Sequence, residues 1–157
     1  MQTEVDRKGP AVKFPPPLIT LVVILSAYGL QQLMPLNIAQ SAGLMPTGFA
    51  IIGLALIIIA ISAVSFIRAK THLEPWKPTS TIVSSGIFTL SRNPIYVGLC
   101  ISCIGIGLVL NSWWVVLSFA PLAWLLLVLV IRREEAYLAR KFGDDYLAYK
   151  KRVRRWF

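Results

Sequence analysis

The chain has 157 residues, 56% of them hydrophobic, and its long stretches without a charged residue exclude an ordinary soluble domain. Its formal net charge of +9 would suit nucleic acid in a soluble protein. The basic residues instead flank the uncharged stretches, which argues against nucleic acid and is typical of membrane proteins.

In chain order, four uncharged stretches are each near the roughly 20 residues that cross about 30 Å of hydrocarbon as a helix. They are Leu18–Met34, Gly48–Ile67, Pro94–Leu110 and Trp113–Ile131. Only Asn111 and Ser112 join the last two stretches, which predicts a tight antiparallel hairpin. We therefore predict an all-α, polytopic membrane protein with four transmembrane helices in a single membrane domain.

The domain divides into an arm (1–17), helices 1 and 2 (18–67), a loop (68–93), helices 3 and 4 (94–131) and a tail (132–157). The connections at 35–47 and 111–112 carry no basic residue, so with four crossings every Lys and Arg lies on one side. The positive-inside rule makes that side cytoplasmic, with both termini there. In a prokaryote the membrane would be the plasma or inner membrane, and the basic side would attract anionic lipid.

Metal or nucleophile chemistry is not indicated. Cys100 and Cys103 lie in an apolar stretch without a nearby histidine, which favours packing over a redox or metal role. His72 is the only histidine and is interpreted as a polar loop residue. We expect no bound metal.

The loop 68–93 and the tail are the longest polar segments between or after the predicted helices. A long connection with little regular structure is usually functional. In the tail, Gly143 should end one helix, and Tyr146, Tyr149, Val153 and Trp156 recur at three- to four-residue spacing. This pattern predicts an amphipathic cytoplasmic helix that lies on the membrane surface or closes over the loop.

The start of the third helix combines features of a cap and of an anion site. Asn93 suits an N-cap and Pro94 the first helical position, which could explain both residues by themselves. The same geometry leaves free N–H groups and a positive dipole end, to which Arg92 adds charge and Tyr96 an aromatic face.

Glu134 and Glu135 are expected at the C-terminal end of the fourth helix, an unfavourable position for acids. They are either a solvated cluster neutralised by Arg132 and Arg133 or a site for a ligand's ammonium group. An anion-binding helix start, a carboxylate and aromatic rings together suit S-adenosylmethionine, whose sulfonium would gain roughly 0.5–2 kcal/mol from an aromatic face. Spacing alone does not single out this cofactor.

Two motifs carry a family resemblance. The stretch Gly86-Ile-Phe-Thr-Leu-Ser-Arg-Asn-Pro-Ile-Tyr-Val-Gly98 resembles the Gly-x-Tyr…Arg-His-Pro-x-Tyr-x-Gly signature of isoprenylcysteine carboxyl methyltransferases. The tail, from Glu134-Glu135 through Phe142-Gly143 to Tyr146 and Tyr149, is similar to the Glu-Glu-x-x-Leu…Phe-Gly-x-x-Tyr-x-x-Tyr pattern of that family. Phospholipid methyltransferases share the broader arrangement.

The resemblance implies an integral membrane methyltransferase that binds S-adenosylmethionine, releases S-adenosylhomocysteine and takes a hydrophobic acceptor from the bilayer, with the tail covering the cofactor. It also implies that Arg132, Arg133 or Arg92 would act on the substrate. The cofactor would be lined by Gly86, Arg92, Asn93, Pro94, Tyr96, Gly98, Glu134 and Glu135.

Asn93 departs from the family pattern because the family has histidine there. Asparagine cannot act as a base near neutral pH. This favours methylation of an already ionised carboxylate over N-methylation of a phospholipid amine such as phosphatidylethanolamine, which remains the alternative. A non-enzymatic four-helix transporter or assembly subunit is the alternative of another class, and the lack of an intramembrane acid or base counts against a transporter.

Overall fold

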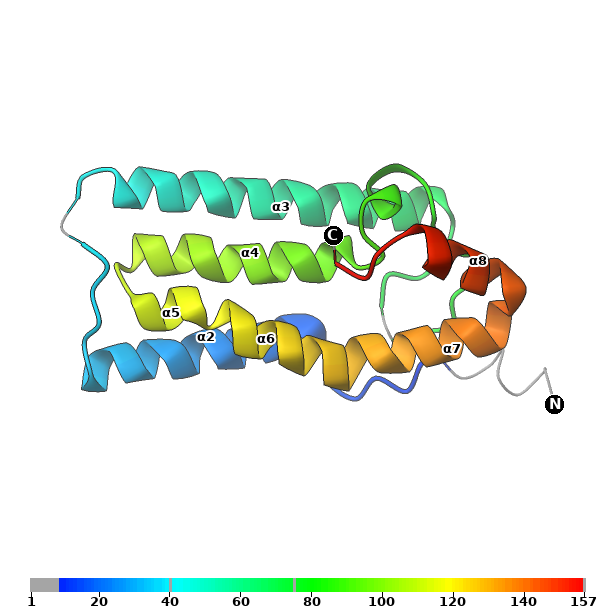
Figure 1. Ribbon diagram of the computed structural model, residues 1–157, viewed down its shortest axis with the longest axis horizontal. Helices are drawn as coiled ribbons and strands as arrows, with labels where there is room; N and C mark the ends of the chain where they lie inside the picture. Colours follow the sequence, from blue (N-terminus) through cyan, green and yellow to red (C-terminus); the bar gives the residue numbers. More distant parts are fainter. Residues whose placement is uncertain (1–8, 40, 75, 157) are drawn as a thin grey trace.

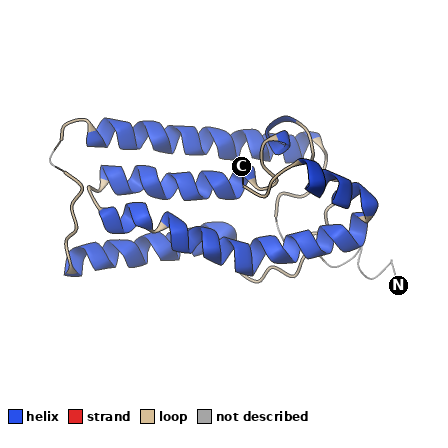
Figure 2. Cartoon of the chain, in the orientation of Figure 1, coloured by secondary structure: helices blue, strands red, loops and turns tan. Residues whose placement is uncertain are grey.

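A computed structural model describes residues 9–39, 41–74 and 76–156, and within these ranges the regular structure is helical (Figures 1 and 2). The predicted all-α class is therefore confirmed. The first residues of the predicted arm, 1–8, lie outside the described residues. The elements are α2 (Pro16–Leu33), α3 (Leu44–Arg68), the 3-10 helix η1 (Gly86–Thr89), α4 (Pro94–Val109), α5 (Trp113–Leu117), α6 (Phe119–Leu126), the π-helical stretch η2 (Leu127–Ile131), α7 (Arg132–Phe142) and α8 (Asp144–Arg152).

Three helical stretches in the described ranges are long and apolar enough to cross a membrane, as in a multi-pass membrane protein. They are Pro16–Leu33, Leu44–Arg68 and the continuous stretch Trp113–Phe142. The remaining predicted span, the third in chain order, corresponds to α4, which has 16 residues. At 1.5 Å per residue its length is about 24 Å, short of the roughly 30 Å of hydrocarbon.

The helices are arranged in a row rather than a square bundle (Figure 1). Helix α3 packs on α4, α4 packs on α5 and α6, and these pack on α2. Glycines allow the close approach of α3 and α4: a Cβ added at Gly105 would lie 2.9 Å from the Gly48 carbonyl oxygen. The first residues of α4 are thereby fixed at the same end of the row as the last residues of α3.

The stretch from α5 to α7 is a single rod with local irregularities. It is interrupted at Ser118, three residues before Pro121, whose missing N–H cannot bond to the preceding turn. Its inner side, which includes Leu122, Leu126 and Val130, is fully buried in the main core. The rod then passes through η2 into α7 without ending.

The expected position of Glu134 and Glu135 at a helix C-terminus is wrong. Both lie in the first turn of α7, which continues to Phe142 because residues 136–142 are mostly good helix formers. The helix ends at Gly143, which has a φ of 51°. The two acids therefore face other segments instead of an exposed helix end.

Helix α8 turns back from Gly143 and lies over the loop 68–93, the second of the two positions expected for it (Figure 1). Tyr146, Tyr149 and Val153 are buried in a small cluster against Ile82 and residues of α7. Its aromatic face thus packs on protein, and its basic residues remain exposed.

Candidate functional site

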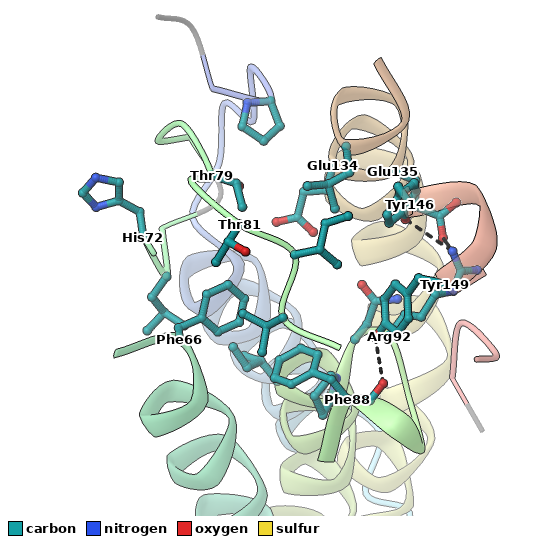
Figure 3. A pocket seen from close by; sticks show the side chains of 18 of the residues that line it. Phe66, His72, Thr79, Thr81, Phe88, Arg92, Glu134, Glu135, Tyr146 and Tyr149 are labelled. Atoms are coloured by element: carbon teal, nitrogen blue, oxygen red, sulfur yellow. Dashed lines mark hydrogen bonds and ion pairs between the residues drawn. The ribbon is translucent and has the colours of Figure 1, made fainter. Parts of the chain in front are cut away.

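A pocket opens where α3 ends and α4 begins, between the loop 68–93, α7 and α8 (Figure 3). Its empty space measures about 830 Å³, including the open mouth. The wall combines apolar side chains such as Phe66, Phe88 and Leu138 with a cluster of polar side chains on one side. The cluster consists of Arg92, Asn93, Tyr96, Glu134, Glu135, Tyr146 and Tyr149.

Glu135 is the centre of an ion-pair network. Arg155 donates two hydrogen bonds to its carboxylate, from Nε and Nη2, each 2.9 Å long. Arg92 Nη1 lies 3.2 Å from Glu135 Oε1, and Lys150 Nζ lies 3.8 Å from Oε2. The Arg92 and Glu135 side chains are 7% and 10% exposed, so these charges depend on one another for compensation. Glu135 is therefore occupied by the protein's own cations.

Arg92 keeps one donor unused. Its Nη1 also donates to the Tyr146 hydroxyl, at 3.3 Å. Its Nε is buried and has no hydrogen-bond partner within the described part of the chain. A buried, charged N–H without an acceptor is costly. Because Arg92 lines the pocket, its guanidinium is suited to an anionic ligand group.

Glu134 differs sharply from its neighbour. Its Oε1 accepts a 2.7 Å hydrogen bond from the Tyr96 hydroxyl. No basic side chain pairs with it among residues 9–39, 41–74 and 76–156. The Glu134 carboxylate lines the pocket and is free to bind a cationic ligand group.

The start of α4 is fixed by the chain that follows α8, residues 153–156, which we call the strap. Asn93 Nδ2 donates to the Arg155 carbonyl oxygen at 3.0 Å, so the side chain contacts the strap instead of capping the helix as expected. Arg92 N donates to the Arg154 carbonyl oxygen at 3.0 Å, and Ser91 Oγ to that of Arg155 at 3.2 Å. The strap holds Arg92 in the wall.

Tyr149 fastens α8 to the loop by donating a 2.7 Å hydrogen bond to the Phe88 carbonyl oxygen. Burial raises the pKa of the Tyr149 hydroxyl to about 12 and also raises the pKa of Tyr146. Hydrogen bonding to Glu135 raises the pKa of Arg155. At neutral pH both tyrosine hydroxyls are thus uncharged and Arg155 is charged.

Four residues expected at the site lie outside the pocket wall. Arg132 and Arg133 are exposed on α7, and Arg133 Nη1 donates to the Ala11 carbonyl oxygen at 3.0 Å. Gly86 is exposed at the start of η1 with a φ of 60°. Gly98 is buried against α3, where an added Cβ would lie 2.6 Å from Ile59 Cγ1.

Sequence reasoning also missed two contributors. Arg155 was counted only as one of many basic residues, and nothing in its surroundings in sequence distinguishes it from Arg154. Tyr149 was placed on the apolar face of the tail helix, and only the fold shows that this face meets the loop. No group of three metal-ligating side chains is present in the described ranges.

Comparisons with known proteins show which family the chain resembles. A sequence model of the family described as phospholipid methyltransferase matches residues 44–145. The chain is 38% identical over 86 residues to the protein-S-isoprenylcysteine O-methyltransferase of Schizosaccharomyces pombe, covering 55% of this chain and 33% of that protein. The human protein of the same name is 37% identical over 75 residues, covering 48% of this chain and 26% of that protein.

A third relative, protein-S-isoprenylcysteine O-methyltransferase B of Arabidopsis thaliana, is 31% identical over 88 residues. The match covers 55% of this chain and 45% of that protein. The chain thus spans less than half of the length of these three relatives.

Proposed function

The chain belongs to the phospholipid methyltransferase family, and from this premise we propose that it is an integral membrane methyltransferase that uses S-adenosylmethionine. In this proposal the acceptor is a carboxylate of an isoprenoid- or lipid-type molecule, in keeping with the names of the yeast and human relatives. The observation that carries the proposal is that Arg92 and Glu134 line one pocket: Arg92 Nε has no hydrogen-bond partner and the Glu134 carboxylate has no cationic partner among the described residues.

The pocket residues fit the charged groups of this cofactor. A carboxylate would accept from Arg92 Nε and from the N–H groups in the first turn of α4. Glu134 would bind the ammonium group, because Glu135 is already paired with Arg92, Arg155 and Lys150. The rings of Tyr96, Phe88 and Tyr149 supply faces for a sulfonium or an adenine.

Methyl transfer to a carboxylate requires little from the protein besides the positioning of the two reactants. Bound S-adenosylmethionine would supply a methyl group carried on a positively charged sulfur. A carboxylate oxygen of the acceptor forms the new C–O bond while the C–S bond breaks, and sulfur keeps the electron pair. Residues of the chain orient the two reactants and exclude water, which can supply much of the rate enhancement.

The acceptor is proposed to be a carboxylate because, among the described pocket residues, Glu134 is assigned to the ligand's ammonium group and neither Asn93 nor His72 is suited to act as the base. Asn93 cannot accept a proton near neutral pH, and its amide is bonded to the strap. His72 is exposed at the mouth, 3.9 Å from Glu74 Oε2, and points away from the polar wall (Figure 3). A carboxylate is already ionised, whereas an amine must first lose a proton.

N-methylation of a phospholipid amine is the second candidate, favoured by the description of the family. One assay separates the two. The purified protein would be incubated with methyl-labelled S-adenosylmethionine and either a prenylcysteine or phosphatidylethanolamine. We expect base-labile ester product with the prenylcysteine only. Labelled phosphatidylethanolamine with no ester would overturn the carboxylate assignment. No methyl transfer to either acceptor would count against the proposed methyltransferase activity.

For the topology we propose that the chain crosses the membrane four times and that α4, although short, is one of the crossings. Helix α4 and the rod would then form the predicted hairpin. The proposal rests on the basic residues and on the packing of α4 between α3 and α5. Both termini and the pocket would then be cytoplasmic, with exposed residues such as Lys151, Arg152 and Arg154 near anionic lipid. A maleimide that cannot cross membranes should label a cysteine at Ala148 in inside-out vesicles but not in intact cells.

A further inference from the structure

Residues 9–15 are the described part of the predicted arm ahead of α2, and the term arm is used for them from here on. The arm contributes Pro10 to the pocket although it lies outside the matched residues 44–145. Pro10 is buried and is part of the pocket wall, together with Glu134 and Thr79. Figure 1 shows this dark blue segment beside the rod, ahead of α2. The arm is therefore in a position to shield the polar side of the pocket.

One attachment of the arm is a backbone contact with the loop that requires glycine. A Cβ added at Gly9 would lie 2.2 Å from the Trp76 carbonyl oxygen and 2.5 Å from its carbonyl carbon. These are backbone atoms, which cannot rotate away as a flexible side chain can. Any larger residue at this position has to displace the arm from the loop.

A second attachment comes from α7. Arg133 Nη1 donates a 3.0 Å hydrogen bond to the Ala11 carbonyl oxygen. Ala11 directly follows Pro10, which lines the pocket together with Glu134, so this bond holds the arm beside the carboxylate. Val12, 6% exposed, belongs to the main core cluster, which also contains Ile131. The arm is thus fixed by the loop, by α7 and by the core.

We propose that the arm forms a wall of the pocket that slows dissociation of the bound ligand. Gly9 and Arg133 are positioning residues that hold Pro10 against the ligand. This inference rests on the proposed function because the ligand used to test it is S-adenosylhomocysteine. Arg133 acts through the arm and does not touch the ligand itself. Loosening the arm should therefore speed ligand dissociation while leaving Arg92 and Glu134 in place.

The first test compares arginines on α7 in the detergent-purified full chain. For Arg133→Ala we expect S-adenosylhomocysteine to bind about 3- to 10-fold more weakly, through a faster dissociation rate, because one hydrogen bond is lost. Arg133→Lys keeps a donor and should recover most of the affinity. Arg140→Ala removes an exposed arginine of the same helix outside the pocket wall and should bind like the wild type. Unfolding temperatures measured alongside exclude a folding defect.

The second test compares two glycines. Gly9→Ala should weaken binding at least as much as Arg133→Ala, because the arm's backbone has to move. Gly53→Ala is the matched control, since no described atom lies within 4 Å of its added Cβ. Wild-type affinity in both Gly9→Ala and Arg133→Ala would overturn the inference and leave the proposed function intact.

A ligand-independent measurement keeps the inference testable if the wild type does not bind, an outcome that would count against the proposed function itself. Pro10→Cys would be labelled with a charged maleimide, with the unsubstituted chain giving the background from Cys100 and Cys103. Labelling should be several-fold faster when Arg133→Ala is added. Equal labelling rates with and without Arg133→Ala would overturn the proposal that Arg133 holds the arm in place.

Discussion

The two ends of the helical row both contain polar side chains, but they use them differently. At the end opposite the pocket, Gln31 is 9% exposed and fully engaged. Its Oε1 accepts from Ser112 Oγ at 2.9 Å and Leu36 N at 3.1 Å, and its Nε2 donates to Asn37 Oδ1 at 2.8 Å. The Asn111 side chain likewise accepts two backbone N–H groups of the same connection. These polar groups have structural partners and fix a connection between helices.

At the pocket end, part of the polar set has no partner. Arg92 Nε is buried without an acceptor in the described ranges, and Glu134 has a hydroxyl partner but no cation. Both ends are polar and partly buried, so polarity alone does not identify a site. Unsatisfied hydrogen-bonding capacity does, because leaving such a group unpaired is costly unless a ligand pairs with it.

The largest effect is expected for Glu135→Ala, which removes the common partner of Arg92, Arg155 and Lys150. Removing one partner of a buried ion pair typically costs about 3–5 kcal/mol. We expect a loss of this size in the free energy of unfolding in detergent, together with weaker ligand binding. Glu74→Ala, which breaks an exposed pair with Lys77, should cost far less, because solvent screens such a pair. Equal costs for the two variants would refute the structural role of Glu135.

Gln31→Leu should destabilise the protein by about 1–3 kcal/mol, because it leaves the hydrogen-bond partners of Gln31 without a partner. The affinity for S-adenosylhomocysteine should stay within about twofold of wild type, since Gln31 lies at the end opposite the pocket and does not line it. Chemical unfolding and calorimetric titration of the same sample measure both quantities. Loss of binding with unchanged stability would reverse the roles assigned to the two ends.

Arg92→Lys keeps a cation near Glu135 and removes Nε. We expect S-adenosylhomocysteine to bind about tenfold more weakly, equivalent to about 1.4 kcal/mol, within the range for one charged hydrogen bond. Stability should change little because the lysine can still pair with Glu135. Calorimetry gives the affinity. A variant that binds as well as the wild type would show that Nε is not a ligand contact.

Tyr149→Phe should have the smallest effect, about 0.5–1.5 kcal/mol, through loss of the hydrogen bond to Phe88. The pKa of Tyr149 in the folded protein is raised to about 12, above its ordinary value near 10. The hydroxyl's contribution is therefore complete below pH 10 and is lost as the pH rises through about 12. The stability difference between wild type and variant should shrink over that range, and a difference that grows would contradict the assignment.

Much of the fold follows from local patterns in the sequence. The uncharged stretches located α2, α3, α4 and the start of the rod to within a few residues, because each is bounded by charge, proline or glycine. The prediction that Gly143 ends a helix is confirmed, and only the position of Glu134 and Glu135 at a helix C-terminus was wrong, because the change from apolar to polar residues at Arg132 marks a membrane boundary and not a helix end. Residues 136–142 remain good helix formers, so only Gly143 stops the helix.

The site was predictable only in part. The motifs brought Arg92, Asn93, Tyr96, Glu134 and Glu135 into one pocket wall. They could not distinguish Glu134 from Glu135, because that difference depends on Arg155, which is distant in sequence. The roles of Asn93 and Arg133 also depend on long-range contacts, with the strap and with the arm.

The most direct test of the account is a calorimetric titration of the detergent-purified protein and its Glu134→Gln variant with S-adenosylhomocysteine. Glu134→Gln removes the charge but keeps the shape and an acceptor for Tyr96. We expect saturable binding to the wild type and at least about tenfold weaker binding to the variant, since one charge-assisted contact is lost. Equal affinity in two folded samples would contradict the proposed role of the unpaired carboxylate, and absence of binding to folded wild type would contradict the proposed function.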